Sequence, residues 1–108
     1  MRPVAIEEAI DQEFGAYWLG DEIPSFSEEF VAHILPMWAR DSADRLRRAV
    51  GEAEVESLRT FLGMLVQNPR HPLIEQISYG SQIHWSRPDT WPHFVRILEI
   101  IRAELLTR

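Results

Sequence analysis

The sequence contains no cysteine and no lysine. Without cysteine the chain cannot form disulfides, thiolate metal sites or a thiol nucleophile, and this absence fits a reducing compartment. Because lysine is missing, all eleven basic residues are arginine. Exclusive use of arginine is typical of a GC-rich, bacterial genome and says nothing about function. These absences exclude several kinds of chemistry and leave the fold open.

Long apolar runs are also missing. The longest, residues 61–66, is interrupted by Gly63 and falls far short of the roughly 20 residues that a membrane span needs. Glu7 and Glu8 come too early for the apolar segment of a signal peptide. We therefore expect a cytoplasmic protein with no membrane contact. A chain of 108 residues has room for a single domain, here predicted as one helical domain over residues 1–108.

Apolar residues recur at helical spacing in several segments. The clearest are three helices predicted at residues 3–19, 52–67 and 91–107, the first opened by Pro3 and the last capped by Asp89 or Thr90. Because five residues cannot make a sheet without a partner, the weak alternation at 81–85 predicts at most a short extended stretch.

The middle of the chain is harder to interpret because Pro36 interrupts a helical pattern. We expect a helix over 27–40, started by Ser25 or Ser27 and kinked at Pro36, and a separate helix over 42–50 capped by Asp41 or Ser42. A further short helix is expected to run from Pro72 to Tyr79. The predicted fold is therefore all-α, a compact irregular bundle of four to five short helices, one of them kinked at Pro36.

The histidines and serines form no recognisable catalytic or metal-binding pattern. The four histidines, His33, His71, His84 and His93, include no pair at metal-ligand spacing, and Glu29 with His33 is only half a site. The serines around Gly80 do not form a nucleophile elbow. We therefore predict no catalytic residue, no cofactor and no metal, and hence no enzyme. A small enzyme or ligand-binding domain using the His84–His93 region is the less favoured alternative.

The densest basic cluster lies around the predicted 42–50 helix. It comprises Arg40, Arg45, Arg47 and Arg48, with acids interspersed among and after them. A nucleic-acid surface needs a basic face, whereas this chain has a pI of about 5.1. We expect these arginines to form local ion pairs and expect no nucleic-acid partner.

Negative charge is concentrated at the front of the chain. Residues 1–30 carry eight acids and one arginine, whereas residues 31–108 carry nine acids and ten arginines. The same front quarter holds Phe14, Tyr17, Trp18 and Phe26. Charge speeds the encounter with an oppositely charged partner, and desolvated aromatic side chains anchor it. Either this quarter docks on a basic protein or it is an ordinary solvated face above a core.

Two features near the C-terminus have two interpretations each. The segment 85–92 holds two tryptophans and two prolines, and it is either a stiff recognition loop or a plug at one end of the bundle. The last helix is apolar over more than one face, which suits either the central helix of the bundle or a dimer seam.

The leading hypothesis is an acidic helical module that docks on a basic protein, as inhibitor or immunity proteins, adaptors and regulatory subunits do. The alternative is a structural homo-oligomer or homodimer assembled through the C-terminal helix. The candidate partner-binding residues are Glu7, Glu8, Asp11, Glu13, Trp18, Asp21, Glu22, Trp85, Arg87 and Trp91.

Overall fold

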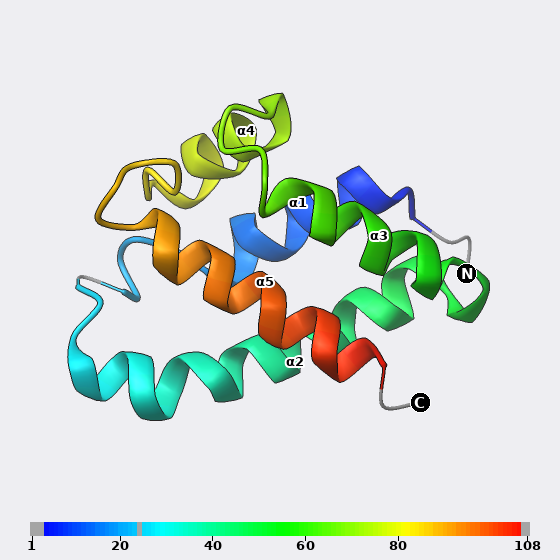
Figure 1. The fold of residues 1–108 in the computed structure, drawn as a ribbon, viewed down its shortest axis with the longest axis horizontal. Helices are drawn as coiled ribbons and strands as arrows, with labels where there is room; N and C mark the ends of the chain where they lie inside the picture. Colours follow the sequence, from blue (N-terminus) through cyan, green and yellow to red (C-terminus); the bar gives the residue numbers. More distant parts are fainter. Residues whose placement is uncertain (1–3, 24, 107–108) are drawn as a thin grey trace.

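The computed structural model describes residues 4–23 and 25–106, which form helices joined by short turns (Figure 1). The helices are α1 (Ile6–Tyr17), α2 (Leu35–Val50), α3 (Val55–Leu65), α4 (Pro72–Ser81) and α5 (Trp91–Leu105). A π-helical turn, Phe30–Ile34, leads directly into α2, and a 3₁₀ turn, Glu52–Glu54, leads into α3. The described residues contain no strand, so the all-α prediction is confirmed and residues 81–85 are not extended into a sheet. The expected role of Pro3 falls outside the described residues.

The predicted boundary between helices at residues 41–42 is wrong, because residues 28–50 are helical without a break. Ser27 starts this helix by accepting the Phe30 N–H at 3.1 Å. Pro36 does not end this helix. In the π turn before it, hydrogen bonds reach five residues back along the chain and not four, as the Leu35 N–H does when it donates to the Phe30 carbonyl. Ser42 does not cap a new helix, because its side chain is fully buried and bonds to other side chains.

The first helix is shorter than predicted at its end. It runs through Gly15 and ends at Tyr17, after which the chain turns back and docks on α4. The Gly20 N–H donates to the Ser81 carbonyl at 2.8 Å. This turn fixes the C-terminal end of α1 against the end of α4.

The boundaries of α4 and α5 differ from the prediction in smaller ways. The fourth helix continues through Gly80 to Ser81 and ends at Gln82, whose backbone is left-handed with φ of 61°. The fifth begins after Thr90, as expected, but Thr90 forms no side-chain cap. Its hydroxyl instead donates to the carbonyls of His84 and Arg87, and so closes the turn before the helix.

The core is built around α5, which crosses the middle of the molecule (Figure 1). It packs on α2 and α3, and α1 packs on α2 and α4. The side chains of Ile97, Leu98 and Ile101 are completely buried. The broad apolar stripe of the last helix is therefore that of a central helix, and α2 and α3 already cover it.

Three of the four arginines in the basic cluster of α2 form ion pairs, as expected, whereas Arg40 is exposed and forms none in the described ranges. Arg48 pairs with Asp44 at 3.1 Å, and Arg47 pairs with Glu52 while donating to the Leu105 carbonyl at 2.7 Å. Arg45 pairs with Glu13 at 2.8 Å. In the described part of the chain, no helix combines the length and apolar character that crossing a membrane requires.

Candidate functional site

Three of the ten predicted partner-binding residues are buried, and for these the structure corrects the prediction. Glu13 is 5% exposed, and the side chains of Trp18 and Trp85 have no exposed surface. Each indole N–H donates to a buried serine hydroxyl. Trp18 donates to Ser42 at 2.9 Å, and Trp85 donates to Ser81 at 3.0 Å. These side chains hold the core together and cannot touch a partner while the fold is intact.

The loop that contains Trp85 is accordingly a plug at one end of the bundle. The Trp85 ring lies 5.8 Å from Phe14 and 5.3 Å from Phe94, centroid to centroid. Trp91 is half-buried and stacks on the same Phe94 ring at 5.5 Å. Residues 86–89 of the loop are exposed, and within them Arg87 pairs with Asp89 at 3.4 Å. The loop therefore offers a partner short polar side chains and one paired arginine, but not the Trp85 ring.

The buried carboxylate of Glu13 organises a polar network between α1 and α2. Ser42 Oγ donates to it at 2.6 Å, and the guanidinium of Arg45 donates through Nη2 at 2.8 Å and through Nε at 3.0 Å. Trp18 Nε1 completes the network by donating to Ser42. No buried side-chain nitrogen or oxygen in the described ranges lacks a hydrogen-bond partner. A buried carboxylate is tolerated here because it is both paired and hydrogen-bonded.

Arg45 joins this network to the surface. Its Cζ lies 3.7 Å from the ring centre of Tyr17, a cation–π contact, while the same guanidinium holds Glu13. The hydrogen bonds to Glu13 raise the pKa of Arg45 above its ordinary value, against partial burial, with further help from Tyr17 and Asp41. Arg45 therefore stays charged throughout the physiological range, and the stability that its raised pKa reflects is present at every pH below the unfolded value.

A hollow of about 340 Å³ lies beside Arg45, between the end of α1 and α2, and we name it the α1–α2 hollow. Its walls include the half-exposed ring of Tyr17 and the partly buried ring of Trp38. Two exposed carboxylates, Glu22 and Asp41, also line it. The full lining is Ala16, Tyr17, Trp18, Leu19 and Glu22 from α1 and the turn after it, and Trp38, Asp41 and Arg45 from α2.

The electrostatics of this hollow favour a cation. Neither Glu22 nor Asp41 forms an ion pair within residues 4–23 and 25–106, and Asp21 lies exposed beside Glu22. The hollow adjoins the C-terminal end of α1, which is the negative pole of the helix dipole, and the last turn of α1 holds no basic residue. The one cation lining the hollow, Arg45, is balanced by Glu13.

Sequence reasoning identified the α1 side of this hollow and missed the α2 side. Trp38, Asp41, Ser42 and Arg45 follow the spacing i, i+3, i+4, i+7, which places them on one face of a continuous helix. Dividing the segment at residues 41–42 hid that stripe. The spacing was the available signal, and a helix continuous through residues 41–42 was needed to recognise it.

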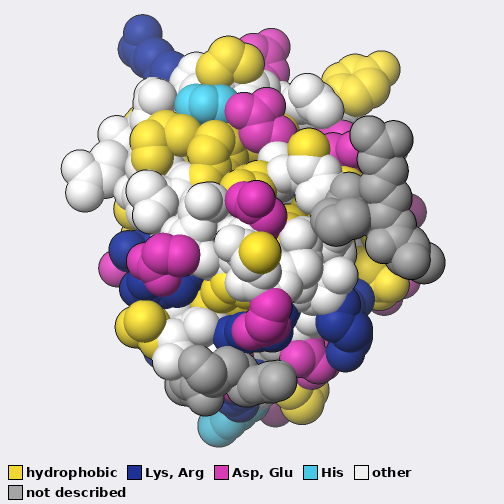
Figure 2. Space-filling model, turned by 90° about the vertical axis from the view of Figure 1, so that its right-hand side faces the viewer, with side chains coloured by type: hydrophobic (Ala, Val, Ile, Leu, Met, Phe, Trp, Pro, Cys, Tyr) yellow, Lys and Arg dark blue, Asp and Glu magenta, His cyan; other side chains and the backbone are white. Residues whose placement is uncertain are grey.

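A second hollow, of about 910 Å³, lies at the opposite end of α1, and we name it the α1–α3 hollow. Figure 2 looks onto this end of the molecule, where hydrophobic side chains come to the surface among carboxylates. Its lining combines an apolar floor with three exposed acids: Val4, Ala5, Ile6, Glu7, Glu8, Glu54 and Phe61.

The acids of the α1–α3 hollow have a structural explanation. Glu7 and Glu8 lie in the first turn of α1, and Glu54 is the residue that precedes α3. Carboxylates at helix N-termini are stabilised by the positive pole of the helix dipole. Their charge is therefore partly offset inside the molecule. Asp11, one turn further along α1, is half-buried and lines neither hollow.

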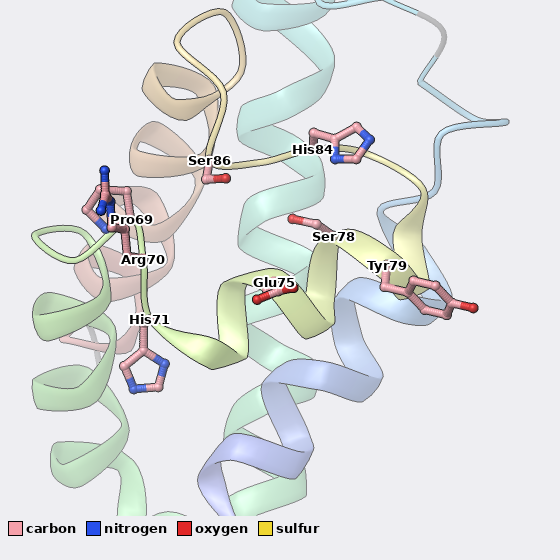
Figure 3. A pocket seen from close by; sticks show the side chains of 8 residues that line it. All are labelled: Pro69, Arg70, His71, Glu75, Ser78, Tyr79, His84 and Ser86. Carbon is pink, nitrogen blue, oxygen red and sulfur yellow. The ribbon is translucent and has the colours of Figure 1, made fainter.

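His84 lines a third hollow, of about 540 Å³, beside α4 (Figure 3). Two of its polar side chains form hydrogen bonds with backbone groups. Ser78 donates to the Ile74 carbonyl at 2.8 Å and accepts the Trp85 N–H at 3.1 Å. His71 Nδ1 likewise accepts the Leu73 N–H at 3.0 Å. Figure 3 shows the Tyr79 ring extending away from the other labelled side chains. The arrangement gives no converging set of nucleophile, base and ligand.

The structure does not bring His84 and His93 into one hollow. His93 stacks on Phe26, with ring centroids 4.5 Å apart and planes 6° from parallel, and lines a separate hollow of about 470 Å³. Across the part of the chain that the structure describes, no three histidine or acidic side chains are grouped so that they could hold a metal ion.

Comparison with protein families, with characterised proteins and with solved structures finds no match to this chain.

Proposed function

We propose that this protein is a binding module that docks on a basic protein through the α1–α2 hollow. The observation that supports the proposal is the pair of exposed, unpaired carboxylates, Glu22 and Asp41, beside the rings of Tyr17 and Trp38. Aromatic surface supplies contact area that can anchor a partner, and carboxylates select the sign of its charge. Inhibitors, immunity proteins, adaptors and regulatory subunits all work by docking of this kind.

The charge of the whole molecule supports the same proposal. The formal net charge is −6, and the acids are concentrated in the first 30 residues, which include one side of the hollow. A negative field of this kind attracts basic partners over a distance of about one Debye length, roughly 8 Å at physiological salt. Docking at the hollow should therefore be sensitive to ionic strength. We also propose that this docking takes place in the cytoplasm.

Three immobilised proteins test the proposal: the wild type, the hollow variant E22Q/D41N and the control variant E75Q/E99Q. The control removes two exposed carboxylates of α4 and α5 that lie outside the hollow, so both variants change the net charge equally. Thermal unfolding first establishes that all three are folded. Extract from the source organism is then passed over each at low and at high salt.

The proposal predicts that the wild type and E75Q/E99Q retain the same basic protein at low salt and release it at high salt, whereas E22Q/D41N does not retain it. Retention by all three proteins alike would show that docking does not use the hollow. Retention by none would count against a binding module of this kind.

A further inference from the structure

We infer that the α1–α2 hollow receives an arginine side chain of the partner, in preference to a lysine. This inference depends on the proposed function and names the residue type that the hollow recognises. The molecule already holds one guanidinium, that of Arg45, at the same place, and further carboxylates and an aromatic ring lie beside it.

Arg45 shows how this region binds a guanidinium. Its Nε and Nη2 both donate to the carboxylate of Glu13, and its Cζ lies 3.7 Å from the centre of the Tyr17 ring. Arginine can donate two N–H groups in a fixed fork to a carboxylate while its guanidinium lies over an aromatic ring, whereas the ammonium of lysine is a point charge without that fork. The end of α1 is therefore already built from the groups that recognise a guanidinium.

The unused lining of the hollow offers the same groups again. Trp38 provides a second aromatic ring, and Glu22 and Asp41 provide two carboxylates that have no ion-pair partner in the described ranges. Since Glu13 already balances Arg45, an incoming cation meets the excess negative charge of Glu22 and Asp41. The negative pole at the end of α1 acts in the same direction.

The size and hydration of the ligand favour arginine further. At about 340 Å³ the hollow lies at the small end of ligand-binding pockets, so it suits one side chain better than a whole small-molecule ligand. A guanidinium is weakly hydrated and can leave water to lie against a ring, whereas an ammonium keeps its water more strongly. A partner lysine should therefore remain at the edge of the hollow, with its charge still solvated.

The test is a titration of ¹⁵N-labelled protein with N-acetyl-arginine amide, followed by NMR. Two matched probes accompany it: N-acetyl-lysine amide, which has the same charge, and N-acetyl-citrulline amide, which has nearly the same shape and no charge. For the arginine probe we expect saturable shifts of the Trp38 indole N–H and of backbone amides in 16–22 and 38–45. The dissociation constant should be on the order of 1 mM, as befits one small group. Lysine should bind at least threefold more weakly, and citrulline should not saturate.

The variants used for docking also test this inference. E22Q/D41N should lose the saturable shifts, and E75Q/E99Q should keep them. Equal binding of arginine and lysine, or shifts that are absent or lie elsewhere, would overturn the arginine site. If the shifts are absent while partner capture still depends on Glu22 and Asp41, the docking proposal survives alone. If arginine binds as expected but no basic protein is captured, the arginine site survives and the docking proposal falls.

Discussion

The two ends of α1 carry similar acids that do different things. At its start, Glu7 and Glu8 lie where the helix dipole is positive, and with Glu54 they edge an apolar hollow. At its other end, Glu13 is buried in a network, and Glu22 lies with Asp41 near the negative pole. The first set stabilises the starts of α1 and α3, whereas Glu22 and Asp41 form no ion pair in the described ranges, and the Arg45 charge near Asp41 is already balanced by Glu13.

This difference shows that an acidic segment cannot be interpreted from its net charge alone. Carboxylates at a helix N-terminus have a structural reason to be there, and a buried carboxylate with two donors has another. The carboxylates that neither explanation covers are Glu22 and Asp41 at the α1–α2 hollow.

Glu13→Ala should lower the free energy of unfolding by about 3 kcal/mol, because it leaves Ser42 and the partly buried Arg45 without their acceptor. Glu7→Ala, at the exposed start of the same helix, should lower it by about 0.5 kcal/mol. Urea denaturation of both variants measures the difference. Similar losses at the two positions would mean that the Glu13 network contributes little to stability.

A pair of glycine substitutions tests how firmly the end of α1 is held. Gly20→Ala should destabilise the fold by about 1–2 kcal/mol, because its Cβ would lie 3.0 Å from the Gln82 carbonyl oxygen. Gly15→Ala should instead stabilise it by about 0.5–1 kcal/mol, since that glycine is inside the helix and a Cβ there meets open space. Thermal unfolding measures both, and a gain at Gly20 would show that the turn is not tightly docked on α4.

Neutralising a pair of adjacent acids at each end of α1 should change the free energy of unfolding only slightly, with a loss expected at the start of the helix alone. E7Q/E8Q removes charge from the positive pole and should lower the free energy of unfolding by about 0.5 kcal/mol at low salt. D21N/E22Q, beyond the negative pole, should leave it unchanged or raise it by about 0.3 kcal/mol. Denaturation at low and high salt measures this, and both differences should shrink as salt screens the charges. Equal losses from the two pairs would contradict the assignment of different roles.

Most of the fold could be predicted from the sequence because apolar spacing dominates it. The stripe Val55, Leu58, Leu62 and Leu65 is buried in α3 as the helical period requires. The boundary at residues 41–42 was predicted wrongly, because Asp41 and Ser42 are ordinary helix-capping residues and no local pattern shows that Ser42 is buried. The helix expected to pass Pro36 does so, but the π turn before the proline was not predicted.

The candidate site could be predicted only in part. Asp21 and Glu22, which were predicted as partner-binding candidates, are both exposed. Glu13, Trp18 and Trp85 could not be recognised as buried, because their partners Ser42, Arg45 and Ser81 lie elsewhere in the chain or, for Ser81, one turn away around a left-handed residue. Burial of a polar residue depends on such long-range pairing, which a local pattern does not contain.

The π turn before Pro36 also bears on how this chain could change over generations. A π turn contains one residue more than an α turn, so deleting a residue from 30–34 would restore an ordinary helix on both sides. That ordinary helix would then collide with Pro36, whose ring opposes the carbonyl four residues back. Replacing Pro36 alone would leave the π turn in place with no proline for it to accommodate. The insertion and the proline therefore form an epistatic pair, and we expect a viable lineage to gain or lose them together.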